Sequence, residues 1–401
     1  MGANAFNNVA KITQSAMDCL ENNLTFSKFV NRQYEDQFRE SGAKIGDTIN
    51  VRVPGFYNVR TGAVANPQGY NDTFKPVVLN QYGVDLQFTT KELKLNMEDG
   101  ESFKQNVLNP MIAPLANFID QQGIALLPQI YQAAGTPATA MTDLNGFLDA
   151  GAILDEAAVP RDGEWSAIMS PRCQSSIVGG LKTLFNPNDD IAEQYRNGTM
   201  GRLAAGFKFS MDQNIPSAAI GSRAVTTPAV HTTVPAEGAT SLTADGGSGN
   251  VAIGDVFTIA GIYKVNPVSK VSTGQLQQFT VTAAGVYTTI AFQPPMYTAT
   301  SGPLQNITAL PGDGALINFL GAASAVGTNN VVFHKDAFGL VCADLPKPSG
   351  VEAVRVRSKK LNIAFRMVNW YNGSQDTELY RLDVLFGWAV LRPTFACRVY
   401  S

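Results

Sequence analysis

Charged residues are scarce in this chain of 401 residues, since Asp, Glu, Lys and Arg make up 16% of it, against roughly 25% in an average soluble domain. The formal net charge is -3, which excludes a strongly basic nucleic-acid-binding protein. No run of about 18 apolar residues occurs, and the first residues lack the apolar run of a signal peptide. We therefore expect no membrane span and synthesis in the cytoplasm.

Residues that build metal and catalytic sites are few as well. The chain has four cysteines, Cys19, Cys173, Cys342 and Cys397. They form no Cys-x-x-Cys pair, so we interpret them as small buried hydrophobic residues rather than zinc ligands or disulfide partners. The only two histidines, His231 and His334, lack metal-ligand spacing, and no phosphate-binding loop or nucleophile elbow occurs. The sequence therefore predicts no catalytic residue, no cofactor and no metal site.

The N-terminal part combines an apolar helical stripe with two alternating segments. Phe26, Phe29 and Tyr34 recur at roughly helical spacing. Residues 46–60 and 76–90 then alternate apolar and polar positions around a turn-rich tip, a pattern typical of a β-hairpin. Two strands of about 14 residues, at roughly 3.3 Å per residue, make an arm about 45 Å long. Such an arm either folds over its own domain or projects onto another subunit, and the sequence leaves both readings open.

Residues 102–131 carry apolar positions at near-helical spacing, which predicts one long helix. Pro110 and Pro114 each remove a backbone donor, so we expect this helix to be kinked or to begin late. Residues 142–220 alternate helical and strand patterns, with a first helix ended by Pro160 and a buried strand in "WSAIMS". That alternation is typical of an α/β or α+β unit.

Composition shifts at about Gly221, where charge nearly vanishes and turn-forming residues take over. From Val251 to about Tyr297, short alternating segments such as "GDVFTIAGIYK" and "QFTVTAAGVYTTIAF" are separated by Gly, Asn and Pro. Because mixed structure resumes past Pro311, we predict a small β-sandwich or barrel inserted into one body. Its predicted core consists of Val256, Phe257, Ile259, Ile262, Phe279, Val281, Ile290 and Phe292.

Two pairs of strands are predicted to close the chain, and the first pair carries the densest basic cluster. The cluster consists of Arg355, Arg357, Lys359 and Lys360. Arg355 and Arg357 alternate with valines, so they lie on one face of a strand. We interpret that face as a solvated or interface surface, with weak, salt-sensitive contact to nucleic-acid phosphates as the alternative.

Four segments are the most specific in the sequence; in chain order they are "YRNGTMGRLAAGF", "GDVFTIAGIYKVNPVSK", "TNNVVFHKDAFGLV" and "VLFGWAVLRPTFACRV". With these segments in this order, the whole chain resembles the coat proteins of tailed bacteriophages of the P-twenty-two type. The resemblance implies an α+β fold, the Hong Kong-type phage capsid fold, with an inserted small all-β barrel-like domain. It also implies self-assembly into pentamers and hexamers that form the procapsid and the icosahedral head around double-stranded DNA.

The resemblance further implies a division of the chain into domains. These are an N-terminal arm (1–45), an extended loop (46–90), the spine helix and peripheral domain (91–140), a first part of the axial domain (141–221), the inserted β domain (222–303), a second part of the axial domain (304–350), and closing strands of the peripheral and axial body (351–401). The inserted domain is expected to aid folding of the subunit and contacts between subunits.

One departure from the family pattern concerns charge. The family's inserted domain often carries a long charged loop that reaches across capsomers, whereas residues 226–250 hold no more than His231, Glu237 and Asp245 as ionisable residues. We hypothesise that ionic subunit contacts use the extended loop instead. The candidate contact residues are Arg60, Asp72 and Lys75 on that loop, with Phe26, Phe29 and Tyr34 near the N-terminus.

The predicted partners are further copies of the chain, a scaffolding protein and a portal protein. A decoration protein is an additional candidate, contact with packaged DNA is expected to be non-specific, and no membrane is involved. The predicted location is the capsid shell of the virion, after synthesis in the host cytoplasm. The alternative is a non-catalytic, β-rich surface-layer or binding protein, which would share the turn-rich middle but would not need a long spine helix.

Overall fold

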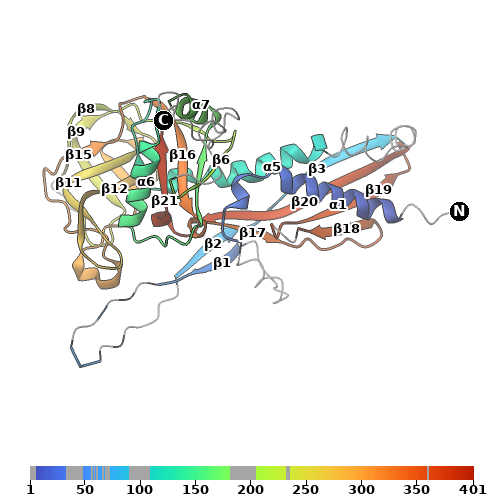
Figure 1. Cartoon of the computed structure of the whole chain (residues 1–401), viewed down its shortest axis with the longest axis horizontal. Coiled ribbons are helices and arrows are strands. Elements are labelled where there is room, and N and C mark those ends of the chain that lie inside the picture. The colour runs from blue at the N-terminus through green and yellow to red at the C-terminus, as the bar shows by residue number, and fades with distance from the viewer. Residues whose placement is uncertain are drawn as a thin grey trace, which may run out of the picture. The chain divides into compact units, whose positions relative to one another are not determined.

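The chain forms two compact units in the computed structural model, each assembled from separate stretches of sequence (Figure 1). The structure describes residues 6–32, 48–55, 57, 59, 62–65, 67, 73–89, 109–180, 205–231, 235–358 and 361–401. The first unit comprises Met1–Val51, Phe74–Gly123 and Phe338–Ala389, and the second comprises Arg52–Thr73, Ile124–Ala337 and Val390–Ser401. Within the described ranges, no helix is both long and apolar enough to cross a membrane.

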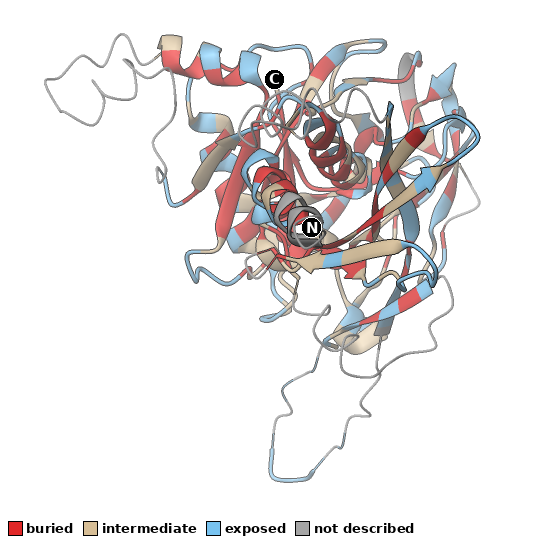
Figure 2. Cartoon of the chain, turned by 90° about the vertical axis from the view of Figure 1, so that its right-hand side faces the viewer, coloured by how far each residue is buried: buried red, intermediate tan, exposed pale blue. Residues whose placement is uncertain are grey.

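The first unit is built on a five-stranded sheet in the order β17-β20-β19-β18, with β3 also paired to β20. The strands are β3 (Asn80–Thr89), β17 (Phe338–Ala343), β18 (Glu352–Arg357), β19 (Ala364–Asn372) and β20 (Thr377–Val390). Helices α1 (Phe6–Asn23) and α5 (Asn109–Ile124) run beside these strands (Figure 1). Their buried residues recur every three or four positions, so each helix turns one apolar stripe inward, while exposed residues gather at turns (Figure 2).

The segment after α1 is fastened to α5 by one carboxylate. Asp120 is buried on α5 and accepts hydrogen bonds from the backbone amides of Thr25 (2.5 Å), Phe26 (3.1 Å) and Ser27 (3.0 Å). These amides open the short 3-10 helix η1 (Phe26–Lys28), whose first donors have no partner within the helix. Asp120 therefore orders the chain where α1 ends.

The predicted hairpin of residues 46–90 is only partly present. β1 (Thr48–Val53) pairs with β2 (Thr73–Val78) in a two-stranded sheet. Residues 80–89 do not continue the hairpin, because β3 pairs antiparallel with β20, from Thr377↔Thr89 to Phe386↔Asn80. Placing residues 80–89 in the arm was therefore wrong, since alternation fixes the buried face of a strand but not its partner.

The predicted helix of residues 102–131 corresponds to α5, and residues 101–108 lie outside the described residues. Pro114 lies within α5, whereas the helix ends at Ile124 and not at Tyr131. The chain then enters the 3-10 helix η3 (Leu127–Gln129). Pro128 explains the earlier end, because it has no N–H to donate to the carbonyl four residues before it.

The second unit contains a sheet in the order β4-β21-β16-β5-β6, with β7 also paired to β16. Its strands are β4 (Ala133–Ala134), β5 (Trp165–Met169), β6 (Lys208–Met211), β7 (Ser217–Ala219), β16 (Val326–His334) and β21 (Ala396–Tyr400). Its helices are α6 (Asn145–Glu156) and α7 (Pro171–Gly180), with 3-10 helices η6 (Lys335–Ala337) and η7 (Pro393–Phe395). The Ser170 hydroxyl accepts from the Cys173 amide (3.2 Å) and so caps α7, which begins at Pro171.

Between β7 and β16 the chain builds the inserted barrel, a six-stranded sheet in the order β15-β11-β12-β14-β9-β8. Its elements are β8 (Ala224–Val230), β9 (Ser241–Ser248), β10 (Asn250–Val251), β11 (Val256–Val265), β12 (Ser272–Val281), β13 (Gly285–Val286), β14 (Thr289–Gln293), η5 (Ala299–Leu304) and β15 (Ile317–Phe319). Ala229 of β8 bridges to Leu316 next to β15, so the two edges of the sheet meet and few backbone groups are left unpaired there.

The barrel extends beyond the predicted end at residue 303, because β15 supplies its last strand. The chain leaves and rejoins the underlying sheet at one place. There Ile220 N donates to the Ala325 carbonyl (2.8 Å), and Ser324 N donates to the Gly221 carbonyl (3.2 Å). A three-residue strand has too little periodicity to be recognised from sequence, which explains the early boundary.

Candidate functional site

The barrel meets the rest of the second unit along a seam of polar side chains, with Arg398 at its centre. Arg398 is fully buried in β21. Its guanidinium donates through Nη1 to the Gly254 carbonyl (2.8 Å) and through Nη2 to the Thr280 hydroxyl (3.1 Å), and both acceptors belong to the barrel. A cation removed from water requires such partners. The last strand of the chain thus holds the barrel in place.

A buried ion pair lies where the chain enters the barrel. Arg223 Nη1 is 3.1 Å from Asp255 Oδ2, and the two side chains are 1% and 2% exposed. Asp255 also accepts from the amides of Gly221 (3.2 Å) and Ala252 (3.0 Å), while Arg223 donates to the Gly321 carbonyl (3.0 Å). Burial raises the pKa of the Asp255 carboxyl, and these amides together with the Arg223 charge oppose the rise. The pair ties the incoming and outgoing segments together.

Side chains of strand β12 also contact the backbone of β4 and of the segment before it. The Gln278 amide donates to the Ala133 carbonyl (2.8 Å) and accepts from the Ala133 N–H (2.7 Å). The Thr280 hydroxyl donates to the Pro128 carbonyl (3.1 Å). Because a carboxamide carries both a donor and an acceptor, Gln278 satisfies both backbone groups of Ala133 as a neighbouring strand would.

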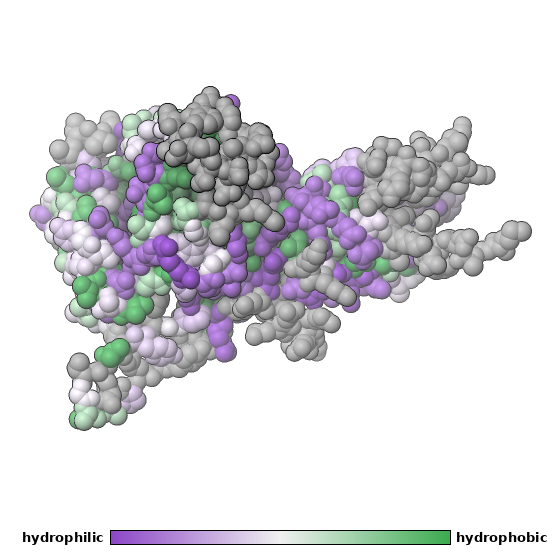
Figure 3. All heavy atoms as spheres, in the orientation of Figure 1, coloured by the Kyte–Doolittle hydropathy of each residue, from purple (hydrophilic) through white to green (hydrophobic). Residues whose placement is uncertain are grey.

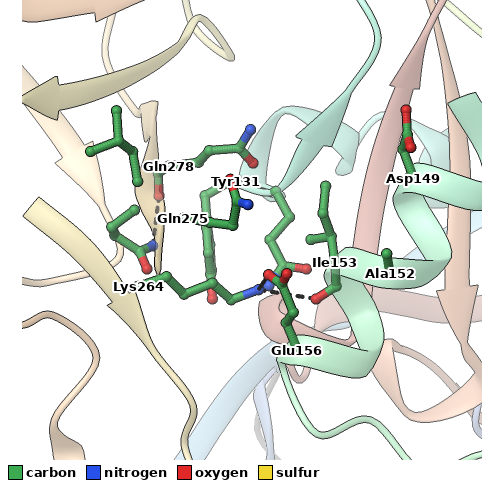
Figure 4. A pocket seen from close by; sticks show the side chains of 11 residues that line it. Tyr131, Asp149, Ala152, Ile153, Glu156, Lys264, Gln275 and Gln278 are labelled. Atoms are coloured by element: carbon green, nitrogen blue, oxygen red, sulfur yellow. Dashed lines mark hydrogen bonds and ion pairs between the residues drawn. The ribbon is translucent and has the colours of Figure 1, made fainter. Parts of the chain in front are cut away.

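The end of β11 caps helix α6 (Figure 4). Lys264 Nζ donates to the Ile153 carbonyl (3.0 Å) and lies 3.9 Å from Glu156 Oε2, while Asn266 Nδ2 donates to the Glu156 carbonyl (2.9 Å). The last turn of α6 contains no basic residue, so the barrel supplies the cation favoured at the carbonyl end of a helix. Burial lowers the pKa of Lys264, and the charge of Glu156 opposes this shift.

A cavity of about 240 Å³ lies beside this cap and is lined by residues of α6, β11 and β12 (Figure 4). Tyr131, Asp149, Gln275 and Gln278 are among the side chains that surround it. Among the residues that the structure describes, no group of three or more His, Cys, Asp and Glu side chains could hold a metal ion. Chemically, the arrangement joins the barrel to its body through hydrogen bonds and buried charges.

The eight predicted core residues of the inserted domain are all buried. Seven of them belong to one cluster inside the barrel, with Phe257, Phe279 and Phe292 in mutual ring contact. Val256 points out of the barrel and packs with Ala133 and Tyr400. The barrel therefore has its own apolar core, with a small apolar contact at the seam.

Three of the six candidate subunit-contact residues lie in the described part of the chain. Phe26 is fully buried in its own unit, with ring centroids 5.3 Å from both Phe338 and Trp388, so it has no surface for another subunit. Its place in the predicted contact is corrected to internal packing. Phe29 is half-buried and Lys75 is exposed. Tyr34, Arg60 and Asp72 lie outside the described residues.

The basic cluster lies partly on β18. Arg355 is exposed and its Nη1 is 3.5 Å from Asp344 Oδ2, while Arg357 is half-buried. Lys359 and Lys360 lie outside the described residues. All four cysteines are free and buried, as predicted.

Sequence reasoning missed the seam residues Arg398, Lys264 and Gln278. Arg398 and Lys264 each gave a usable signal, because each is a single charged residue within an apolar strand pattern. Such a charge is either exposed or paired with a buried partner. Gln278 gave no such signal in the sequence, since a glutamine in an amphipathic strand is ordinarily solvated.

Comparisons with solved structures return phage capsids. A chain of Mycobacterium phage Che8 is 12% identical, with a TM-score of 0.45 over 94% of this chain and 90% of that one. The capsid of Cyanophage P-SCSP1u is 13% identical, with a TM-score of 0.43 over 89% and 84%. The CUS-3 coat protein I-domain is 25% identical, with a TM-score of 0.21 over 24% of this chain and 97% of that one. No curated protein sequence matches the chain.

The sequence profile of a coat-protein family, described as P22 coat protein (gene protein 5), matches residues 76–397. This range covers well over half of the 401 residues. The observed architecture, helices with mixed and antiparallel sheets and an inserted six-stranded barrel, agrees with the predicted α+β fold with an inserted all-β domain. The chain therefore belongs to the P22 coat protein family and is a structural protein of the virion shell, not an enzyme.

Proposed function

We propose that this chain is the subunit of pentamers and hexamers in the icosahedral head of a tailed, double-stranded DNA phage. The observation that carries the proposal is the family match over residues 76–397. Self-assembly into a shell follows from that family, and the division of the shell into pentamers and hexamers is the part that we propose. The alternative of a surface-layer or binding protein has no such support.

Exposed apolar side chains on the extended loop support contact with a neighbouring copy. Val59, Val64 and Tyr57 are 96%, 84% and 55% exposed in the isolated chain. Large apolar residues that are exposed together mark interaction surfaces in soluble proteins. The loop then acts as a contact arm, to which Arg60, Asp72 and Lys75 would contribute ionic contacts.

The proposed partners beyond the chain itself are a scaffolding protein, a portal protein and a decoration protein. Packaged DNA would be met by Arg355, Arg357, Lys359 and Lys360 on the inner surface. Four cations give a weak electrostatic contact with phosphates, and salt screens this contact. A weak contact is suitable for an inner surface along which DNA must move during packaging. A variant with all four residues replaced by Gln should still form shells. These shells should no longer retain DNA in a salt-sensitive manner.

Electron microscopy of the expressed chain, alone and with its neighbouring genes, tests the proposal. We expect closed shells with fivefold and sixfold capsomers in at least one of these samples. A product that stays monomeric at high concentration, with and without the scaffolding protein, would contradict it. Shells built from pentamers alone would contradict the hexamer half of the proposal and leave the coat function in place.

A further inference from the structure

The turn between β11 and β12 has an inverted polarity. Val268 and Val271 are 74% and 64% exposed. Lys270, between them, folds back and donates through Nζ to the carbonyls of Pro303 (2.6 Å) and Gln305 (3.5 Å). A turn that serves only to connect strands normally exposes its charged residue and buries its apolar ones. In this turn the two valines are exposed, while Lys270 is half-buried and its ammonium is bonded to backbone carbonyls.

The turn is also held rigidly. Asn266 Oδ1 accepts from the amides of Val268 (2.9 Å) and Ser269 (3.0 Å), and Asn266 N donates to the Val271 carbonyl (3.0 Å). Lys270 adopts a φ of 57°, in the left-handed region that disfavours a side chain. The same Asn266 is bonded to α6 through its Nδ2 atom. A fixed turn loses little conformational entropy when a partner covers it.

Leu304 is a further exposed apolar residue in the segment to which Lys270 is bonded. It is 52% exposed and lies between the two residues whose carbonyls accept from Lys270. We call Val268, Val271 and Leu304 the knob. Hydrophobic patches of this kind are visible on the barrel surface (Figure 3). The turn leaves no charge at the knob except the tucked Lys270, so nucleic acid is a poor match for it.

A complementary hollow occurs on the same barrel. The groove, of about 480 Å³, is lined by Pro228, Leu316, Phe319 and Ala322 among others. Leu316 is 46% exposed. The one cation at its wall, Arg223, is paired with Asp255 and stacks over the Phe319 ring at 4.3 Å. The groove therefore offers an apolar surface without an unpaired charge.

Knob and groove flank opposite ends of β11. The groove strand β15 pairs with Phe257, Thr258 and Ile259 near the start of β11, whereas the knob follows Val265 at its end. Val265 lies six to eight positions after these paired residues, which corresponds to roughly 20–26 Å of strand. A copy therefore cannot place its own knob in its own groove, and the two surfaces remain available to other copies.

We propose that the knob of one copy fills the groove of the next copy, so that the inserted barrels make a head-to-tail contact around each capsomer. The proposal rests on the proposed function, because it requires self-assembly. Two different patches on one chain form a heterologous interface, and such interfaces close into rings when the rotation permits. Pentamers and hexamers are rings of this kind. The contact is apolar and not ionic, which is consistent with the small number of charged residues in the barrel.

Disulfide trapping in assembled shells tests the contact. Val268→Cys and Leu316→Cys are prepared as separate variants with tags of different length, and the native cysteines, which are all buried, serve as the background. Mixed assembly followed by oxidation should give covalent dimers that contain one chain of each kind, whereas neither variant alone should crosslink. The chain carrying both substitutions should give a ladder that ends at five or six subunits.

Crosslinking of Val268→Cys with itself would overturn the proposal in favour of a twofold knob-to-knob contact. Absence of crosslinks in shells that microscopy shows to be intact would overturn it as well, while leaving the proposed function standing. Absence of shells in the wild-type sample would instead overturn the proposed function and, with it, this inference.

Introducing a carboxylate into the knob or into the groove tests the contact independently, through the concentration needed for assembly. Val268→Asp and Leu316→Asp should each raise the concentration needed for assembly by about tenfold, since a buried carboxylate in an apolar groove has no partner. Val286→Asp is the matched control, because Val286 is 62% exposed on β13 and belongs to neither surface. Normal assembly of Val268→Asp, or an equal loss in Val286→Asp, would contradict the proposal.

Discussion

At the scale of single residues, Arg398 has the most consequential position in the second unit. It is a fully buried cation on the last strand, and both hydrogen bonds of its guanidinium reach the barrel. Its substitution leaves the Gly254 carbonyl and the Thr280 hydroxyl without their donor in a place that water does not reach. Hydrogen bonds that involve a charged group contribute about 1.5–3 kcal/mol each.

We predict that Arg398→Met lowers the free energy of unfolding of the second unit by about 3 kcal/mol. Arg398→Lys should lower the free energy of unfolding by less, because an ammonium can still reach one of the two acceptors. Denaturant unfolding followed by intrinsic fluorescence measures both. Arg172→Ala, at an exposed position of α7, should stay within about 0.5 kcal/mol of the wild type. A shift for Arg398→Met no larger than for this control would show that the seam is not stabilised by Arg398.

Glu237 shows where one of the few charges of the insertion is used. Its carboxylate accepts from Thr298 N (3.1 Å), Thr300 Oγ1 (2.8 Å) and Ser301 Oγ (2.7 Å), so it fastens residues 235–238 to η5. Hydrogen bonds from Thr298 and Ser301 lower the pKa of Glu237 to about 2. The charge therefore stabilises the barrel to which it belongs.

A lowered carboxyl pKa stabilises the fold above the ordinary value and ceases to do so as pH falls toward the folded value. For Glu237 this window runs from the ordinary value of 4.5 down to about 2. We expect Glu237→Gln to melt at a lower temperature than the wild type at pH 7, and the difference to shrink as pH falls through this window. A difference in melting temperature that stays constant with pH would show that the charge of Glu237 does not stabilise the fold.

At the scale of elements, the pairing of β3 with β20 depends on a glycine. A Cβ added to Gly83 would lie 2.5 Å from the Leu382 carbonyl oxygen and 2.7 Å from Asp383 Oδ1. The first of these is backbone and cannot rotate away. Asp383 itself is buried and held by Arg366 (2.6 Å) and Arg381 (2.8 Å), so it too resists displacement.

We therefore predict that Gly83→Ala destabilises the first unit by about 1–3 kcal/mol, because β3 must move away from β20. Urea unfolding provides the measurement. Gly285→Ala is the matched control, since an added Cβ there meets no atom within 4 Å. If both substitutions had the same effect, backbone entropy alone would account for the change, and the close approach would play no part.

Elements that repeat a pattern locally could be predicted from the sequence, whereas their partners could not. The alternation around Phe257 and Phe279 identified β11, β12 and the barrel core, because a period of two fixes which side chains are buried. The partner of β3 lies almost 300 positions away in β20, and nothing in residues 80–89 names it. The seam was missed for the same reason, since Lys264 and Ile153 are 111 positions apart.

At the scale of the whole chain, the insertion is part of the fold and not an appendage. Its two ends lie within one hydrogen bond of each other at Gly221 and Ser324, so the chain could in principle close without it. Yet the underlying body relies on the barrel, which donates Lys264 and Asn266 to α6 and accepts from Arg398. Removing the barrel therefore exposes a helix end and leaves a cation without its acceptors.

We predict that deleting residues 222–323 and joining Gly221 to Ser324 through two glycines yields a poorly soluble chain that forms no regular shells. Adding Arg398→Met to this deletion should recover part of the soluble yield, because replacing an orphaned charge by an apolar residue removes its desolvation cost. Soluble yield and electron microscopy of both chains provide the readout. If Arg398→Met raises the soluble yield of the deletion variant and Arg172→Met does not, the low solubility is caused by the loss of the seam contacts. Normal shells from the simple deletion would show that the body folds and assembles without the barrel, and would contradict this account of the insertion.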